Sequence, residues 1–197
     1  MKVYYIKIDD LDQTGIDAIS LVDVPAVQRN FLCFSEAKPV NLKFDASKHI
    51  ITGVVCLADT PIYRYSEKYG EYYVVFSKET IQKMVEKFSR MDLFKSVNLQ
   101  HDDNKFVDGI YMVESYIVNS ERGISPIEFR DIPDGSWVAS YKVDNENLWN
   151  DIVNGGKLNG FSLQGLFNLD PEKFESQEVP ENGVGESFDE WLNKYIQ

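Results

Sequence analysis

The sequence predicts a mostly β protein with peripheral helices, of the α+β class. Many short stretches of β-branched and aromatic residues are separated by polar turns, which is typical of strands. Only two or three stretches have the spacing of an amphipathic helix. With 197 residues, 43% of them hydrophobic, the chain is long enough for one ordinary domain with an extension.

The predicted strands extend from the N-terminus to residue 169. They cover residues 3–8, 50–57, 72–76, 97–100, 110–118, 137–143 and 161–169. Polar and apolar side chains alternate between Ser136 and Val143, as in a strand with one buried face. Residues 1–45 contain Pro25 and Pro39, and form either an N-terminal subdomain or the first strands of the main domain. Residues 46–169 then make up the core.

Two helices are expected inside the core. Ser77 can cap the first, because its apolar residues follow at helical spacing: Ile81, Met84, Val85 and Phe88. The second covers residues 145–154 and ends at Gly155 and Gly156.

Residues 170–197 differ in composition from the core. Glutamates, prolines and glycines between residues 170 and 186 indicate a flexible acidic linker. Ser187 and Glu190 then form a capping-box pattern at the start of a short amphipathic helix. That helix either folds back onto the core or docks on a partner.

The charge and the cysteines exclude several classes of protein. A net charge of −12 and a pI near 4.6 argue against a nucleic-acid partner, because such binding depends on clustered Lys and Arg. Cys33 and Cys56 lie in apolar stretches and are expected to be buried thiols, with a disulfide as the alternative. No stretch is typical of a signal peptide or a membrane span, so we expect a cytoplasmic protein without a membrane partner.

His101 is the candidate base among only two histidines. It ends a predicted strand and opens a polar turn, where a scaffold can hold a side chain open to substrate. A metal site made with Asp102, Asp103 and Asp108 is an alternative, but this spacing matches no known metal loop. We therefore expect neither metal nor cofactor. His49, just before a strand, is expected to be a surface or edge residue.

Ser162 is the candidate nucleophile. It lies in a strand between Gly160 and Gly165, and such glycines let the backbone approach a bound peptide closely. Gly160, Phe161 and Gly165 are therefore candidate substrate-binding residues. The spacing is not that of a nucleophile elbow, because a strand follows the serine where an elbow has a helix. A serine hydroxyl needs a base within hydrogen-bond reach, and the residue pattern does not show whether His101 meets Ser162.

Several blocks of the sequence, in order, resemble the XkdF-like phage prohead proteases, which are distantly similar to herpesvirus assemblin. The blocks cover residues 19–27, 75–77, 98–102, 108–115, 135–143 and 159–165. The resemblance implies a compact β-barrel around residues 46–169. It also implies a serine endopeptidase that cleaves scaffold and capsid-protein extensions inside the phage prohead, in the cytoplasm of the bacterial host. Capsid and scaffold proteins would be its partners, and a homodimer could form by analogy with assemblin.

In the catalytic machinery implied by this resemblance, Ser162 is the nucleophile and His101 the general base. Assemblin has a second histidine after its serine, and here no histidine follows Ser162. Glu114 is the preferred third member, because its strand leaves the His101 turn and a neighbouring strand could present it to the imidazole. Asp102, Asp189, Glu190 and a plain Ser–His dyad remain open. A non-catalytic head-assembly protein that keeps the protease fold is the alternative function.

Overall fold

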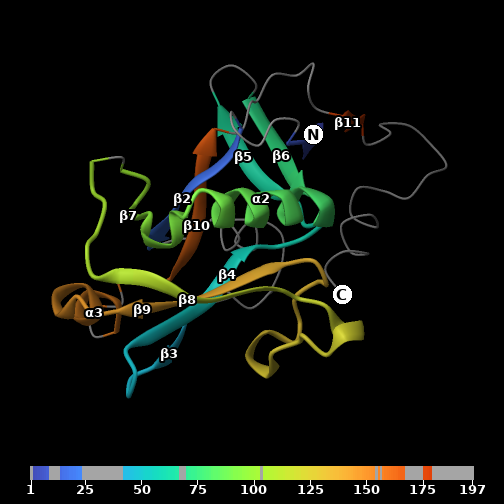
Figure 1. Cartoon of the computed structure of the whole chain (residues 1–197). Helices are drawn as coiled ribbons and strands as arrows, with labels where there is room; N and C mark the ends of the chain where they lie inside the picture. Colours follow the sequence, from blue (N-terminus) through green and yellow to red (C-terminus); the bar gives the residue numbers. More distant parts are fainter. Residues whose placement is uncertain are drawn as a thin grey trace.

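The computed structural model describes residues 2–8, 14–23, 42–66, 70–102, 104–153, 155, 157–166 and 175–178. These residues form a mostly β structure of three sheets with the helices α2 and α3 (Figure 1). The α+β class is confirmed. Within the described residues the sheets are open, and the expected closed barrel is not found.

The first sheet has the strand order β11–β1–β6–β5. Its strands are β1 (Lys2–Ile6), β5 (Ile62–Ser66), β6 (Gly70–Phe76) and β11 (Glu175–Glu178). β1 runs parallel to β6 and antiparallel to β11. Residues 175–178 were expected in a flexible linker, but they form an edge strand on β1. The expected C-terminal helix lies outside the described residues.

The second sheet has the order β10–β2–β7 and carries the candidate site. Its strands are β2 (Gly15–Val22), β7 (Val97–Leu99) and β10 (Gly160–Leu166). β2 is central, antiparallel to β10 and parallel to β7. β1 and β2 thus both pair with strands from far later in the chain.

The third sheet is antiparallel and has the order β3–β4–β9–β8. Its strands are β3 (Lys43–Asp45), β4 (Ile50–Cys56), β8 (Ile110–Ile117) and β9 (Trp137–Val143). The last three agree closely with the prediction. The connection from β8 to β9 contains the 3₁₀ turns η2 (Ser120–Arg122) and η3 (Ile127–Phe129).

Both predicted core helices are present. α2 (Lys78–Arg90) begins after Ser77, whose hydroxyl accepts a hydrogen bond from the Thr80 backbone N–H, as predicted. α3 covers Glu146–Val153, and a further 3₁₀ turn, η1 (Leu93–Lys95), precedes β7. Among the described residues, no helix is long and apolar enough to cross a membrane.

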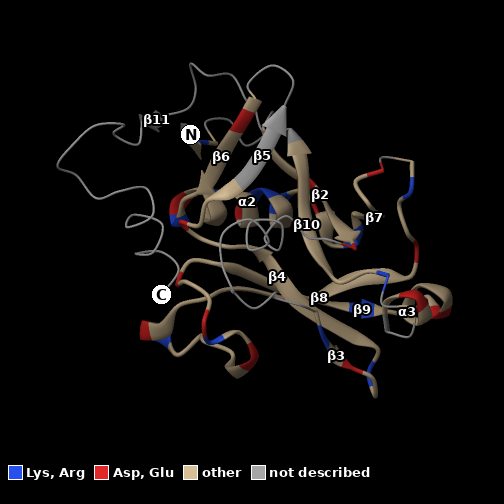
Figure 2. Ribbon diagram, turned by 180° about the vertical axis from the view of Figure 1, so that it is seen from behind, with Lys and Arg blue, Asp and Glu red and all other residues tan. Residues whose placement is uncertain are grey.

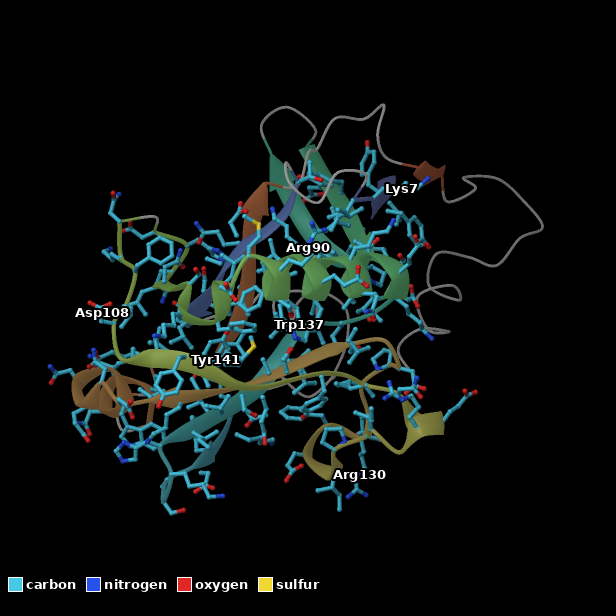
Figure 3. The ribbon with its side chains drawn as sticks, in the orientation of Figure 1. Lys7, Arg90, Asp108, Arg130, Trp137 and Tyr141 are labelled. Carbon is cyan, nitrogen blue, oxygen red and sulfur yellow. The ribbon has the colours of Figure 1, made fainter. Side chains whose placement is uncertain are left out.

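One apolar core joins the three sheets and both helices. It includes Ile19 and Leu21 of β2, Ile81 of α2, and Trp137 and Tyr141 of β9. Trp137 lies below α2 (Figure 3), where its ring packs edge-on against Phe88 with 5.3 Å between centroids. Cys56 is buried as expected, whereas Cys33 lies outside the described residues. The site sheet is therefore backed by densely packed side chains, which fixes its strands.

Candidate active site

Three polar side chains form a row across β10, β2 and β7. The register pairs Ser162 with Ser20 on the antiparallel side and Ser20 with Asn98 on the parallel side. Residues paired in register lie on the same face of a sheet. Ile19 and Leu21 point into the apolar core, so Ser20 between them points to the opposite face together with its two partners.

A tight turn after β7 brings His101 to this row. Gln100 and His101 have φ values of 56° and 58°, and the Asp102 N–H donates to the Leu99 carbonyl at 3.0 Å. Two consecutive central residues with positive φ are the feature of a type I′ turn. For residues other than glycine this conformation costs about 1–3 kcal/mol each, and such costs are typically found at functional sites.

The imidazole of His101 lies between two serine hydroxyls. Its Nε2 is 3.0 Å from Ser162 Oγ, and its Nδ1 is 3.0 Å from Ser20 Oγ. Ser162 is 5% exposed and Ser20 is fully buried, whereas His101 is exposed. The distance to Ser162 is that required between a nucleophile and its general base.

The uncharged side-chain amides of Asn98 and Gln164 surround Ser20, the serine on the Nδ1 side of the imidazole. Ser20 Oγ is 2.5 Å from Asn98 Oδ1 and 3.0 Å from Gln164 Oε1. The Asn98 amide nitrogen donates to Gln164 Oε1 at 2.5 Å. β10 and β7 carry no charged residue, and Figure 2 shows the described part of β10 in tan, the colour of uncharged residues. The described contacts of Ser20 are therefore made to dipoles and to the imidazole.

Asp23, just after β2, connects the three segments that carry the site. When the Gln100 side-chain amide is oriented to match its neighbours, the Gln100 amide nitrogen donates to Asp23 Oδ1 at 3.2 Å. The Gln100 amide oxygen accepts from the Asp23 N–H, also at 3.2 Å. The Asn159 side chain donates to the Asp23 carbonyl at 3.1 Å, just before β10 begins. These contacts hold the strained His101 turn against β2 and β10.

The expected contact between Glu114 and His101 is not the one found. Glu114 is exposed on β8 in the third sheet, where its carboxylate accepts a hydrogen bond from Ser140 Oγ at 2.7 Å. The residue that contacts His101 Nδ1 is Ser20, which is not among the predicted site residues. Ser20 had one recognisable signal, because it is a polar residue between two strongly apolar ones in the block at residues 19–27.

The other candidates for the third position have different surroundings. Asp102 forms an ion pair with Lys105 at 2.7 Å, and hydrogen bonds from Lys105 and from the Asn104 N–H lower the pKa of Asp102. Asp189 and Glu190 lie outside the described residues.

In the described part of the chain, no three His, Cys, Asp or Glu side chains are grouped so that they could hold a metal ion.

The candidate substrate-binding residues have structural roles in this arrangement. Phe161 is 2% exposed, and its ring lies 5.2 Å from that of Tyr141 in the core, so a substrate could meet only its backbone. A Cβ at Gly165 would lie 2.1 Å from the Gly15 carbonyl oxygen, so only glycine fits where β10 bulges against β2. Gly160 begins β10 opposite Val22.

His49 lies apart from this site. Its ring stacks on Trp149 of α3 with 4.4 Å between centroids, and its Nδ1 is 3.9 Å from Glu146 Oε1. Its side chain is 29% exposed in the turn between β3 and β4, in agreement with the expected surface or edge position.

A comparison with protein families identifies the class. Residues 39–169 match the model of the family described as "Putative phage serine protease XkdF", and this match covers more than half of the chain. The chain belongs to this family of phage serine proteases. No curated protein and no solved structure matches the chain, and the distant similarity to herpesvirus assemblin is not shown.

The segment matched to the XkdF family contains most of the hydrogen-bonded group. His101, Ser162, Asn98 and Gln164 all lie within residues 39–169, whereas Ser20 lies before them. The strand that completes the site therefore comes from the part of the chain that the family match does not cover.

Proposed function

We propose that this member of the XkdF family is an active serine endopeptidase with Ser162 as nucleophile and His101 as general base. The observation that supports the proposal most is the 3.0 Å contact between Ser162 Oγ and His101 Nε2. A serine hydroxyl is a weak nucleophile unless an adjacent base accepts its proton. In a family of serine proteases, this pair has the geometry that a nucleophile and its base require.

The proposed reaction has two steps that use the same base. Ser162 Oγ attacks the carbonyl carbon of the scissile peptide bond while His101 Nε2 accepts the hydroxyl proton. The imidazolium then gives this proton to the leaving amine, and an acyl-enzyme on Ser162 remains. In the second step water attacks the ester carbonyl and gives a proton to His101 Nε2. The bond between the carbonyl carbon and Ser162 Oγ then breaks, the imidazolium returns the proton to Ser162 Oγ, and the carboxylic acid product leaves.

We further propose that the substrates are scaffold and capsid-protein extensions in the phage prohead, inside the bacterial host. The order of the sequence blocks that resemble prohead proteases supports this substrate class, together with the family membership. Association into a homodimer is part of the same proposal, by analogy with assemblin.

Ser162→Ala tests the catalytic assignment, and Ser140→Ala is its matched control. Ser140 is fully buried in the third sheet, so both variants remove one buried hydroxyl from a strand. Each protein is co-expressed with the major capsid protein of the same phage, and its labelling by a fluorophosphonate probe is measured. We expect Ser162→Ala to lose labelling and processing by about 10³-fold or more, and Ser140→Ala to keep both.

Two outcomes would contradict the proposal. Processing at the normal rate by Ser162→Ala would exclude Ser162 as the nucleophile. A wild-type protein that is neither labelled nor able to process capsid protein, while still binding it, would favour the non-catalytic head-assembly function.

A further inference from the structure

We propose that Ser20 is the positioning residue of this site and takes the place that a carboxylate has in a Ser–His–Asp triad. The inference rests on the proposed roles of Ser162 and His101. In our proposal the Ser20 hydroxyl accepts a hydrogen bond from His101 Nδ1–H and thereby holds the neutral imidazole in the tautomer whose Nε2 can accept a proton from Ser162.

The direction of each hydrogen bond follows from counting protons. A serine hydroxyl has one proton to donate. Two of the atoms around Ser20 Oγ, Asn98 Oδ1 at 2.5 Å and Gln164 Oε1 at 3.0 Å, are acceptors only. Gln164 Oε1 already receives a hydrogen bond from the Asn98 amide nitrogen. The Ser20 proton therefore goes to Asn98 Oδ1, which leaves the lone pairs of Ser20 Oγ for His101.

The protonation of His101 follows from this arrangement. Ser20 Oγ can then only accept from Nδ1, 3.0 Å away, so Nδ1 carries the single proton of the neutral ring. Nε2 presents its lone pair to Ser162 Oγ at 3.0 Å. The hydrogen bonds form a series in which each residue donates to the next one, in the order Ser162, His101, Ser20, Asn98 and Gln164.

Burial and strand register make this series of hydrogen bonds rigid. Ser20 and Asn98 are both fully buried, so water does not compete for their hydrogen bonds. They are direct neighbours in the parallel pairing of β2 and β7, and Ser162 is the direct neighbour of Ser20 on the other side. A carboxylate at this depth would need compensation for its desolvation, whereas hydroxyl and amide dipoles are satisfied by one another.

If these hydrogen bonds ran in the reverse direction, the proton of the neutral imidazole would lie on the other ring nitrogen, which can be measured. If both amides were turned over, Asn98 would donate to Ser20, Ser20 would donate to Nδ1, and the ring proton would lie on Nε2. Ser162 would then face a donor and have no base in the resting site.

¹⁵N NMR of the histidine rings distinguishes these directions without any substrate. The chain has only two histidines, and the spectrum of His49→Gln assigns the His101 signals. We expect neutral His101 in the wild-type protein to be protonated at Nδ1, and this state to be lost in Ser20→Ala but kept in Ser140→Ala. Protonation at Nε2 in the wild type, or an Nδ1–H state that Ser20→Ala leaves unchanged, would overturn the inference.

The rate of fluorophosphonate labelling of Ser162 is the second measurement. A wrong tautomer lowers the rate of the chemical step, so Ser20→Ala should reduce labelling by about 10²-fold or more while Ser140→Ala stays within about twofold. Equal labelling of Ser20→Ala and wild type would overturn the positioning role. Failure of the proposed function is seen separately, because either Ser162→Ala would retain activity or the wild type would show none, whatever the His101 tautomer is.

Discussion

Among the described residues, two rows of polar side chains each cross three strands, and the row in the second sheet contacts His101. In the second sheet the row is Ser162, Ser20 and Asn98. In the third sheet it is Thr52, Ser140 and Glu114, joined by hydrogen bonds of 2.9 Å and 2.7 Å. Both rows contain a fully buried serine, and of these two rows the one in the third sheet includes a carboxylate.

Each of these two sheets also has a histidine with positive φ at a strand end. His101 has φ 58° after β7, and His49 has φ 52° before β4. His101 contacts two serine oxygens, whereas His49 packs its ring face against Trp149. The comparison teaches that the contact between base and hydroxyl distinguishes the site, and that a carboxylate beside a serine does not.

Replacing each histidine by glutamine should give the largest difference between the two sheets. Glutamine can form hydrogen bonds but cannot accept a proton near neutral pH, so His101→Gln removes the base. We expect His101→Gln to lower peptidase activity by about 10³-fold or more, and His49→Gln to change it by less than about twofold. The measurement is the rate of fluorophosphonate labelling and of capsid-protein processing.

Thermal unfolding of the two histidine variants provides the control. His49→Gln loses ring stacking on Trp149 and should lower the free energy of unfolding by about 1 kcal/mol. Comparable losses of activity in both variants would mean that the contact with Ser162 has no special role.

Replacing one glycine by alanine in the second sheet and one in the third should produce an intermediate effect on stability and activity. In Gly165→Ala the new Cβ would lie 2.1 Å from the Gly15 backbone oxygen, so β10 must move away from β2. In Gly53→Ala it would meet the end of the Leu42 side chain at 2.6 Å and the Phe161 ring at 3.0 Å, and side chains can shift more easily. We expect a loss of stability of about 3 kcal/mol or more for Gly165→Ala and about 1–2 kcal/mol for Gly53→Ala.

Chemical denaturation measures both stabilities, and labelling of the folded proteins measures the site. Gly165 follows Gln164 directly, so Gly165→Ala should also slow labelling more than Gly53→Ala does. Equal stability of Gly165→Ala and the wild type would show that the bulge in β10 can accommodate a side chain.

Local patterns in the sequence predicted the elements that depend on neighbouring residues. The hydroxyl of Ser77 caps α2 as the spacing indicated, and the alternation between Ser136 and Val143 corresponds to β9. The approach of His101 to Ser162 was suggested by residue type and resemblance, and the structure places them in contact. Both residues stand at recognisable places, a strand end and a strand framed by glycines.

The parts that could not be predicted depend on pairing between distant segments. Ser20 meets His101 across 81 positions because β2 lies between β7 and β10, and residue patterns contain no information on that order. The prediction of Glu114 depends on its strand, which leaves the His101 turn, and on a neighbouring strand that could present its carboxylate to the imidazole. The pairing of β8 with β9 places its carboxylate against Ser140 instead.

Glu114→Gln should have the smallest effect and tests the comparison from the side of the carboxylate. Glutamine keeps an oxygen that can accept the hydrogen bond from Ser140, and Glu114 is exposed, so stability should change by less than about 0.5 kcal/mol. Labelling of Ser162 should stay within about twofold of the wild type, because the observed contact of Glu114 is to Ser140 in the other sheet. A loss of about 10²-fold would show that this carboxylate acts on His101 during catalysis, and a similar loss in Ser140→Ala would connect the two polar rows.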